Sequence, residues 1–120
     1  MKFLWTTIDV KDLQESVKFY EEIVGLKVIR RVEGGPSTIA FMGDGEGTTV
    51  ELITHQGAAP KAIGEGISIG FAVDNLDDHI AFIKEKGLSV HAGPFSPNPA
   101  IRFYYVLDPN GVRVQFVEGN

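Results

Sequence analysis

The chain has 120 residues, no cysteine and a formal net charge of −5. This length suits one domain and excludes a two-domain enzyme, and the lack of cysteine excludes disulfide frameworks, thiolate metal sites and cysteine nucleophiles. The acidic balance, with no basic cluster beyond Arg30-Arg31, argues against a nucleic-acid partner. No apolar run approaches the roughly 18 residues of a membrane span and no signal-peptide pattern is present, so we expect a cytoplasmic protein with no membrane partner.

The first half of the chain predicts one helix and four strands. β-branched and aromatic residues alternate over 3–10, which indicates a strand. A helix over 12–24 follows, because Asp12 and Glu15 have capping-box spacing and Gly25 stands where a left-handed C-cap belongs. Three short β-rich segments complete a βαβββ order, at 26–32, 37–42 and 48–54.

The second half repeats this order. A strand is predicted at 67–73, then a helix that begins at an Asn75 cap, with Asp78 three residues later, and closes at Gly87. Strands at 88–91, 101–107 and 112–118 follow. The chain is therefore predicted to be a single α+β domain of two βαβββ units, about 1–54 and 67–120, joined by the Gly/Ala/Pro-rich connection 55–66.

The period-2 alternation of the strands predicts a binding face on each unit. Side chains that point away from the helix share one face of the sheet. If the two sheets curl together, these faces form a concave cup with mostly aromatic walls and a few polar groups, which is typical of a small-molecule pocket. The residues predicted to line this cup are Trp5, Phe41, Glu51, Ser68, Phe103, Tyr105 and Gln115.

Several features allow more than one interpretation. Trp5 is either core or an aromatic floor for a ligand, and His55, four residues after Glu51 on the same face, is either a rim residue or a proton shuttle. His79 is predicted to be a solvated residue of the second helix. The segment 93–99 has three prolines in seven residues, so we expect no strand interior there but a flap or a surface connection.

Three motifs resemble the vicinal oxygen chelate superfamily, which includes glyoxalase I, bleomycin-resistance and fosfomycin-resistance proteins and extradiol dioxygenases. They are D-L-x-x-S-V-x-F-Y-E-E-x-V-G-L at 12–26, V-E-L at 50–52 and Y-x-x-D-P-N-G-x-x-x-Q-F at 105–116. The resemblance covers essentially the whole chain. It implies a glyoxalase-like fold, a partly closed cup of mixed sheet, and a homodimer.

The resemblance also implies four positions for a divalent metal, which fall on Trp5, Glu51, Ser68 and Gln115 in this sequence. Only Glu51 matches the family's ligand types directly. We therefore expect no cofactor; if a metal binds, its ligands are Glu51 and Gln115. The resemblance to glyoxalase I also implies a glutathione site with basic residues at the rim of the cup. The matching position here is the acidic Asp9, which disfavours glutathione as a substrate.

Two hypotheses of function follow. The first is metal-free binding or sequestration of a planar or cationic small molecule, similar to bleomycin-resistance proteins, with Glu51 as the charge partner of an aromatic floor. The alternative is a metal-dependent lyase or isomerase similar to glyoxalase I that acts on a vicinally oxygenated substrate. An intermediate case is metal-free acid–base catalysis by Glu51, helped by His55.

Overall fold

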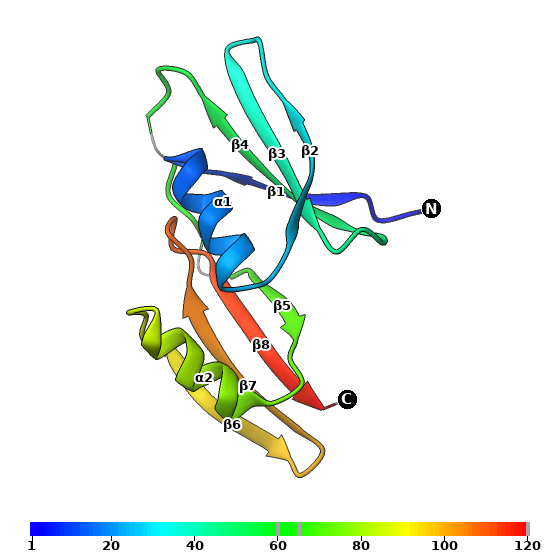
Figure 1. The fold of residues 1–120 in the computed structure, drawn as a ribbon, viewed down its shortest axis with the longest axis vertical. Coiled ribbons are helices and arrows are strands. Elements are labelled where there is room, and N and C mark those ends of the chain that lie inside the picture. The colour runs from blue at the N-terminus through cyan, green and yellow to red at the C-terminus, as the bar shows by residue number, and fades with distance from the viewer. Residues whose placement is uncertain (60, 65, 120) are drawn as a thin grey trace. The chain divides into compact units, whose positions relative to one another are not determined.

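A computed structural model describes residues 1–59, 61–64 and 66–119 and divides the chain into two compact units, Met1–Ala62 and Ile63–Asn120. Pro60 and Glu65 of the predicted connection lie outside the described residues. The first unit contains β1 (Trp5–Asp9), α1 (Leu13–Glu22), β2 (Lys27–Val32), β3 (Ser37–Gly43) and β4 (Thr49–His55) (Figure 1).

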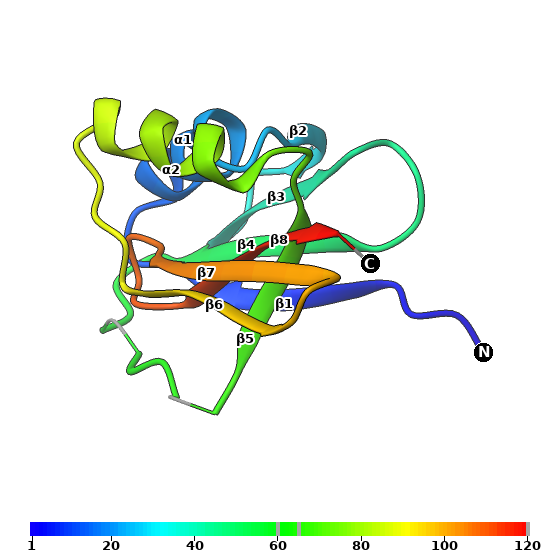
Figure 2. The ribbon, with the colours of Figure 1, turned by 90° about the horizontal axis from the view of Figure 1, so that it is seen from below.

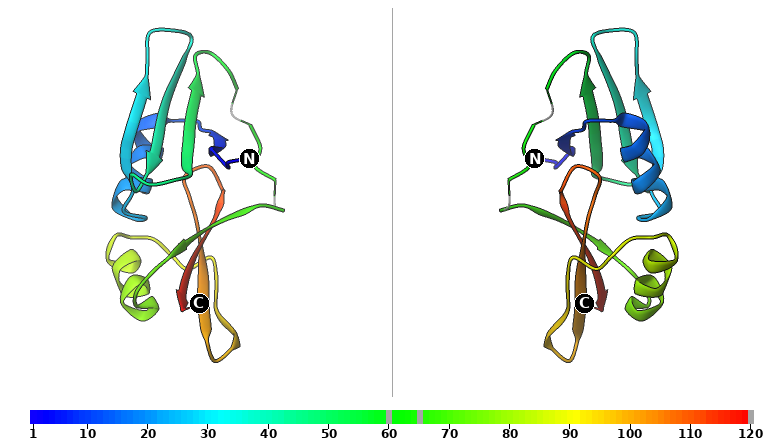
Figure 3. Two further views of the ribbon diagram at one scale, coloured as in Figure 1. Left: turned by 90° about the vertical axis from the view of Figure 1, so that its right-hand side faces the viewer. Right: turned by 90° about the vertical axis from the view of Figure 1, so that its left-hand side faces the viewer.

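The first sheet has the strand order β1-β4-β3-β2, in which β1 and β4 run parallel and the other pairs antiparallel. Figure 3 shows β2, β3 and β4 side by side. One face of this sheet packs against α1 and is buried, since every second side chain of a strand points the same way. The core residues of the unit include Ile8, Val17, Tyr20, Met42 and Leu52.

The second unit has the same order of elements, which confirms the predicted repeat and the α+β class. Its elements are β5 (Ser68–Ala72), α2 (Leu76–Glu85), β6 (Ala92–Asn98), β7 (Ile101–Leu107) and β8 (Arg113–Gly119). The strand order β5-β8-β7-β6 matches that of the first sheet, with β5 and β8 parallel. Among the described residues, neither helix is long and apolar enough to cross a membrane.

The predictions for 88–91 and for the proline-rich segment after it were wrong. No strand forms at 88–91, and the chain instead pairs with β7 as β6, through Ala92, Phe95 and Asn98 (Figure 2). Pro94 and Pro97 fall between these paired residues, and β6 is the edge strand of its sheet. An edge position leaves one side of the strand free of partners, so prolines are tolerated there.

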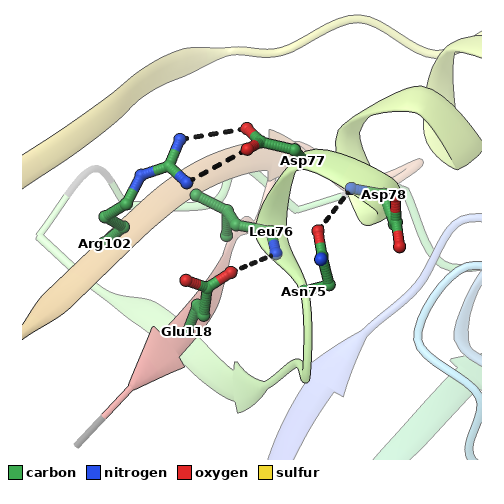
Figure 4. A network of polar contacts seen from close by, with 6 residues as sticks. All are labelled: Asn75, Leu76, Asp77, Asp78, Arg102 and Glu118. Carbon is green, nitrogen blue, oxygen red and sulfur yellow. Dashed lines mark hydrogen bonds and ion pairs between the residues drawn. The ribbon is translucent and has the colours of Figure 1, made fainter.

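Both helices begin at the predicted caps. The Asp12 carboxylate accepts a hydrogen bond from the Glu15 backbone N–H at 3.0 Å, and Asn75 Oδ1 accepts one from the Asp78 N–H at 2.9 Å (Figure 4). At the start of α2, the Leu76 backbone N–H also donates a hydrogen bond to the Glu118 carboxylate at 2.6 Å. This bond ties the helix start to β8.

An ion pair between Asp77 and Arg102 joins the same helix start to β7, with 3.0 Å between Arg102 Nη2 and Asp77 Oδ1 (Figure 4). The hydrogen bond and charge of Arg102 hold the pKa of Asp77 below its ordinary value. Both side chains are solvent-accessible, so the pair orients the helix start more than it stabilises the unit.

The two caps give a matched prediction. Asp12→Ala and Asn75→Ala should each lower the free energy of unfolding by about 1 kcal/mol, because each removes the acceptor for one helix N–H. Urea denaturation followed by circular dichroism measures both. A neutral result for either variant would mean that its helix does not depend on the cap.

The prediction that His79 is a solvated surface residue was wrong. Its ring is half-buried, its Nδ1 is hydrogen-bonded to the Tyr104 hydroxyl, and its centroid lies 4.3 Å from that of Phe116. His79 follows Leu76 by three residues and precedes Ile83 by four, and both of those are fully buried. Helical spacing therefore places it on the inner face of α2.

The buried phenol of Tyr104 should make the stability of the protein fall at alkaline pH. Burial raises the pKa of its phenol above the ordinary value. Above about pH 10 the unfolded chain loses this proton while the folded chain keeps it, so stability falls as pH rises further. The Tyr104→Phe variant should lack this alkaline fall in stability. At neutral pH its free energy of unfolding should be about 1 kcal/mol lower than that of the wild type. Urea midpoints between pH 8 and 11 measure both effects, and a difference between the two proteins that does not change with pH would contradict the account.

Candidate functional site

The first sheet presents an aromatic patch on the face away from α1. Trp5 is 42% exposed, and its ring meets that of Phe41 edge-on, with 5.3 Å between centroids. The Arg30 guanidinium lies 4.5 Å from the centre of the Phe41 ring, so Phe41 itself is only 6% exposed. Trp5 is therefore a surface residue of its unit and not a core residue, and its ring packs against that of Phe41.

Glu51 lies beside this patch. It is half-buried, pairs across the sheet with Phe41 on one side and Thr7 on the other, and accepts a hydrogen bond from the Thr7 hydroxyl. A hydroxyl donor fixes a carboxylate oxygen while leaving its other lone pairs available. We call Trp5, Thr7, Phe41 and Glu51 the Trp5 face.

His55 contacts polar side chains near the end of β4. Its Nδ1 lies 2.7 Å from the Ser37 hydroxyl, and its Nε2 lies 3.2 Å from Asp9, whose other oxygen is 3.7 Å from Lys61 Nζ. These contacts hold His55 among polar neighbours at the end of β4. Asp9, His55 and Lys61 line a pocket of about 280 Å³.

The second sheet carries an aromatic cluster on the corresponding face. Phe95, Phe103 and Tyr105 lie 5.7–6.4 Å apart between centroids. Gln115 donates a hydrogen bond to the Tyr105 hydroxyl at 3.2 Å, and the Arg113 guanidinium lies 4.3 Å from the Tyr105 ring centre. Three predicted residues thus come together, Phe103, Tyr105 and Gln115.

Ser68 is exposed and pairs with Arg113 at the start of β5. This pairing corresponds to that of Trp5 with Thr49 in the first unit. The predicted equivalence of Ser68 with Trp5, and of Gln115 with Glu51, is therefore confirmed by register. That the two faces line one cup remains a prediction.

The donors at the four family metal positions do not fit a divalent metal of the nickel or zinc type. The Trp5 indole nitrogen is a donor only, and the Ser68 hydroxyl is a weak neutral ligand. The Gln115 amide nitrogen is engaged with Tyr105, and its Oε1 lies over Gly70, 3.2 Å from where a Cβ would stand. Among residues 1–59, 61–64 and 66–119, no three His, Asp or Glu side chains gather in a group that could hold a metal ion.

The order of elements and the paired sheets agree with a family match over nearly the whole chain. A family model described as the glyoxalase/bleomycin resistance protein/dioxygenase superfamily matches residues 2–116. The chain belongs to this superfamily. The resemblance inferred from the three sequence motifs is thereby confirmed.

Several relatives of this chain are named lactoylglutathione lyase. Lactoylglutathione lyases from Salmonella typhimurium and Escherichia coli O157:H7 are 31% and 30% identical, over 98% of this chain and 93% of their own lengths. Glyoxalase I of Leishmania major has a similar structure, with a TM-score of 0.85 and 26% identity over 98% of this chain and 86% of its own. Glyoxalase I of Zea mays matches with a TM-score of 0.87 and 26% identity over 98% of this chain and 44% of its own. These names favour the lyase alternative over metal-free sequestration.

The residues predicted to line the cup did not include four side chains of the two faces, Thr7, Arg30, Phe95 and Arg113. Thr7 and Arg30 complete the surroundings of Glu51 and Phe41, and Arg113 lies over Tyr105. Thr7 and Arg113 have a signal in the strand alternation, since they share the faces of Trp5 and Gln115. Arg30 has none, because the register of β2 shifts between Val28 and Arg30.

Proposed function

We propose that this member of the superfamily binds a small organic molecule on the Trp5 face. The ligand stacks on the Trp5 ring and places a positively charged group near the Glu51 carboxylate. The observation that carries the proposal is an exposed indole, supported edge-on by Phe41, beside a half-buried carboxylate. A large aromatic surface with a few placed polar groups is the usual composition of a small-molecule site.

Fluorescence tests this proposal directly, since Trp5 is the single tryptophan of the chain. Planar cations such as ethidium and thioflavin T should quench its emission saturably, and calorimetry gives the stoichiometry. A planar anion of similar size is the matched control and should bind more weakly. Equal binding of cation and anion, or quenching that never saturates, would contradict the role given to Glu51.

A second candidate function is a lyase or isomerase, and the names of the relatives favour it. Glyoxalase I-like chemistry, as the resemblance implies, uses a divalent metal to polarise vicinal oxygens. The donors at Trp5, Ser68 and Gln115 do not fit that metal. What the chain itself offers is the Glu51 carboxylate, which can accept and return a proton while Thr7 holds one of its oxygens.

An assay of lactoylglutathione formation and breakdown tests the second candidate. Activity that is lost in Glu51→Gln, and that requires nickel, zinc or manganese, would establish the lyase and overturn sequestration. No turnover with any of the three metals, together with saturable quenching of Trp5, would leave binding as the function.

We also propose that the protein is a cytoplasmic homodimer. Support for self-association comes from large apolar side chains that stay exposed in single units, Phe3 and Leu4 in the first and Ile67 in the second. Light scattering should give twice the 13.1 kDa mass of one chain. A monomer at micromolar concentration would refute the dimer.

A further inference from the structure

A second pocket lies wholly in the second unit, at the start of β8. Its volume is about 440 Å³, which suits a small ligand or one group of a larger one. Its lining combines backbone, apolar side chains and two basic groups, and no acidic side chain among the described residues lines it. The lining residues are Ile63, Gly64, His91, Leu107, Gly111 and Arg113.

Arg113 carries an unsatisfied donor in this unit. Its Nε atom is buried and has no hydrogen-bond partner, and it is the sole buried side-chain nitrogen or oxygen of this kind in the part of the chain that the structure describes. Nor does Arg113 form an ion pair with any described residue. Buried donors are almost always satisfied, so an orphaned guanidinium N–H indicates a missing acceptor.

The guanidinium packs on an aromatic ring, and its Nε–H stays without a hydrogen-bond partner. It lies 4.3 Å from the centre of the Tyr105 ring, and Tyr105 is itself fixed by the hydrogen bond from Gln115. The His91 backbone N–H donates to the Tyr105 carbonyl at 2.7 Å, which brings that histidine to the same pocket. Contact with an aromatic face occupies the flat surface of a guanidinium and leaves the N–H groups along its edge, Nε–H and Nη–H, to pair with an acceptor.

We propose that Arg113 anchors an oxyanion site that takes a carboxylate or phosphate group of a small molecule. The Nε–H and Nη–H edge matches two oxygens of such a group, and the anion supplies the acceptor that Nε lacks. The His91 ring, which carries at least one N–H, adds a second donor. This site lies outside the Trp5 face and goes beyond the binding function proposed there.

The Arg113 Nε–H signal in nitrogen–proton correlation spectra reports this site directly. Titration with inorganic phosphate, and separately with acetate, should shift it saturably, while sodium chloride at equal ionic strength should not. The two titrations distinguish a phosphate site from a carboxylate site. Equal, unsaturated shifts of all arginine signals would overturn the proposal, because they would indicate ionic strength alone.

Two variants at this position test the role of the guanidinium edge, with the His91 backbone signal as readout. Arg113→Lys keeps the charge but loses the paired donors and should weaken binding about tenfold, whereas Arg113→Gln should abolish it. Arg31→Lys, a change at an arginine of the first unit that lies near Glu33, is the matched control and should bind like the wild type. Unchanged binding in Arg113→Gln would overturn the proposal.

Glu65 follows two lining residues in the sequence and lies outside the described residues. The Glu65→Gln variant therefore checks for an internal partner. Binding of phosphate or acetate that is the same in this variant and in the wild type supports an open site. Binding that appears only in Glu65→Gln would refute it in favour of an internal ion pair.

Discussion

Phe116→Ala should lower the free energy of unfolding by about 3–5 kcal/mol. The ring is 1% exposed at the centre of the second unit, where it contacts the rings of His79, Tyr104 and Phe71 with centroids 4.3–6.4 Å away. Truncation removes most of that apolar contact and leaves a cavity beneath α2. Urea denaturation followed by far-ultraviolet circular dichroism measures the loss.

Phe95→Ala is the matched control for this change. Phe95 belongs to the edge strand β6 and is 46% exposed, so its truncation should cost less than about 1 kcal/mol. Equal losses in the two variants would contradict the packing of the second unit.

We propose that the two units form a single domain, and the Phe116→Ala variant tests this. Trp5 belongs to the first unit and Phe116 to the second. If the units unfold as one domain, the fluorescence transition of Trp5 in Phe116→Ala should shift together with the circular dichroism transition. A Trp5 transition that stays at the wild-type midpoint would show that the units unfold separately.

Glu51→Gln should weaken the binding of a planar cation to the Trp5 face by about 10- to 100-fold. Hydrogen bonds to a charged group contribute about 1.5–3 kcal/mol, and each 1.4 kcal/mol corresponds to about a factor of ten in Kd. The glutamine keeps the shape of the side chain and removes its charge. Trp5 fluorescence titration measures the change.

Two further variants make this result specific. Glu21→Gln changes the net charge equally but lies on the exposed side of α1, and it should leave the Kd unchanged. Thr7→Val removes the hydroxyl that orients Glu51 and should weaken binding only a few-fold. Equal weakening by Glu21→Gln and Glu51→Gln would mean that the ligand responds to overall charge and not to this carboxylate.

Local signals explain why most of the fold could be predicted. The capping pairs Asp12 with Glu15 and Asn75 with Asp78 act within three residues, and the structure has both bonds. Strand alternation is equally local, which is why the faces that carry Trp5 and Gln115 were assigned correctly. The signal for His79 was also present in its spacing from Leu76 and Ile83, and it was outweighed by the polar residues beside it.

The remaining features depend on contacts between distant parts of the chain. Thr7 reaches Glu51 across 44 positions of sequence, and Arg113 meets Tyr105 because β7 and β8 pair in a particular register. The β6 strand escaped prediction because its prolines are acceptable only at an edge, and edge position is a property of the whole sheet. Such features follow from the fold and not from a sequence window.

The most direct test of the account is the metal content of the purified, untagged protein after exposure to nickel, zinc and manganese, with Glu51→Ala as the control. The donors at Trp5, Ser68 and Gln115 predict that no stoichiometric metal is retained and that the two proteins do not differ. About one metal ion per chain in the wild type, lost in Glu51→Ala, would contradict metal-free binding and establish the site of a metal-dependent lyase or isomerase.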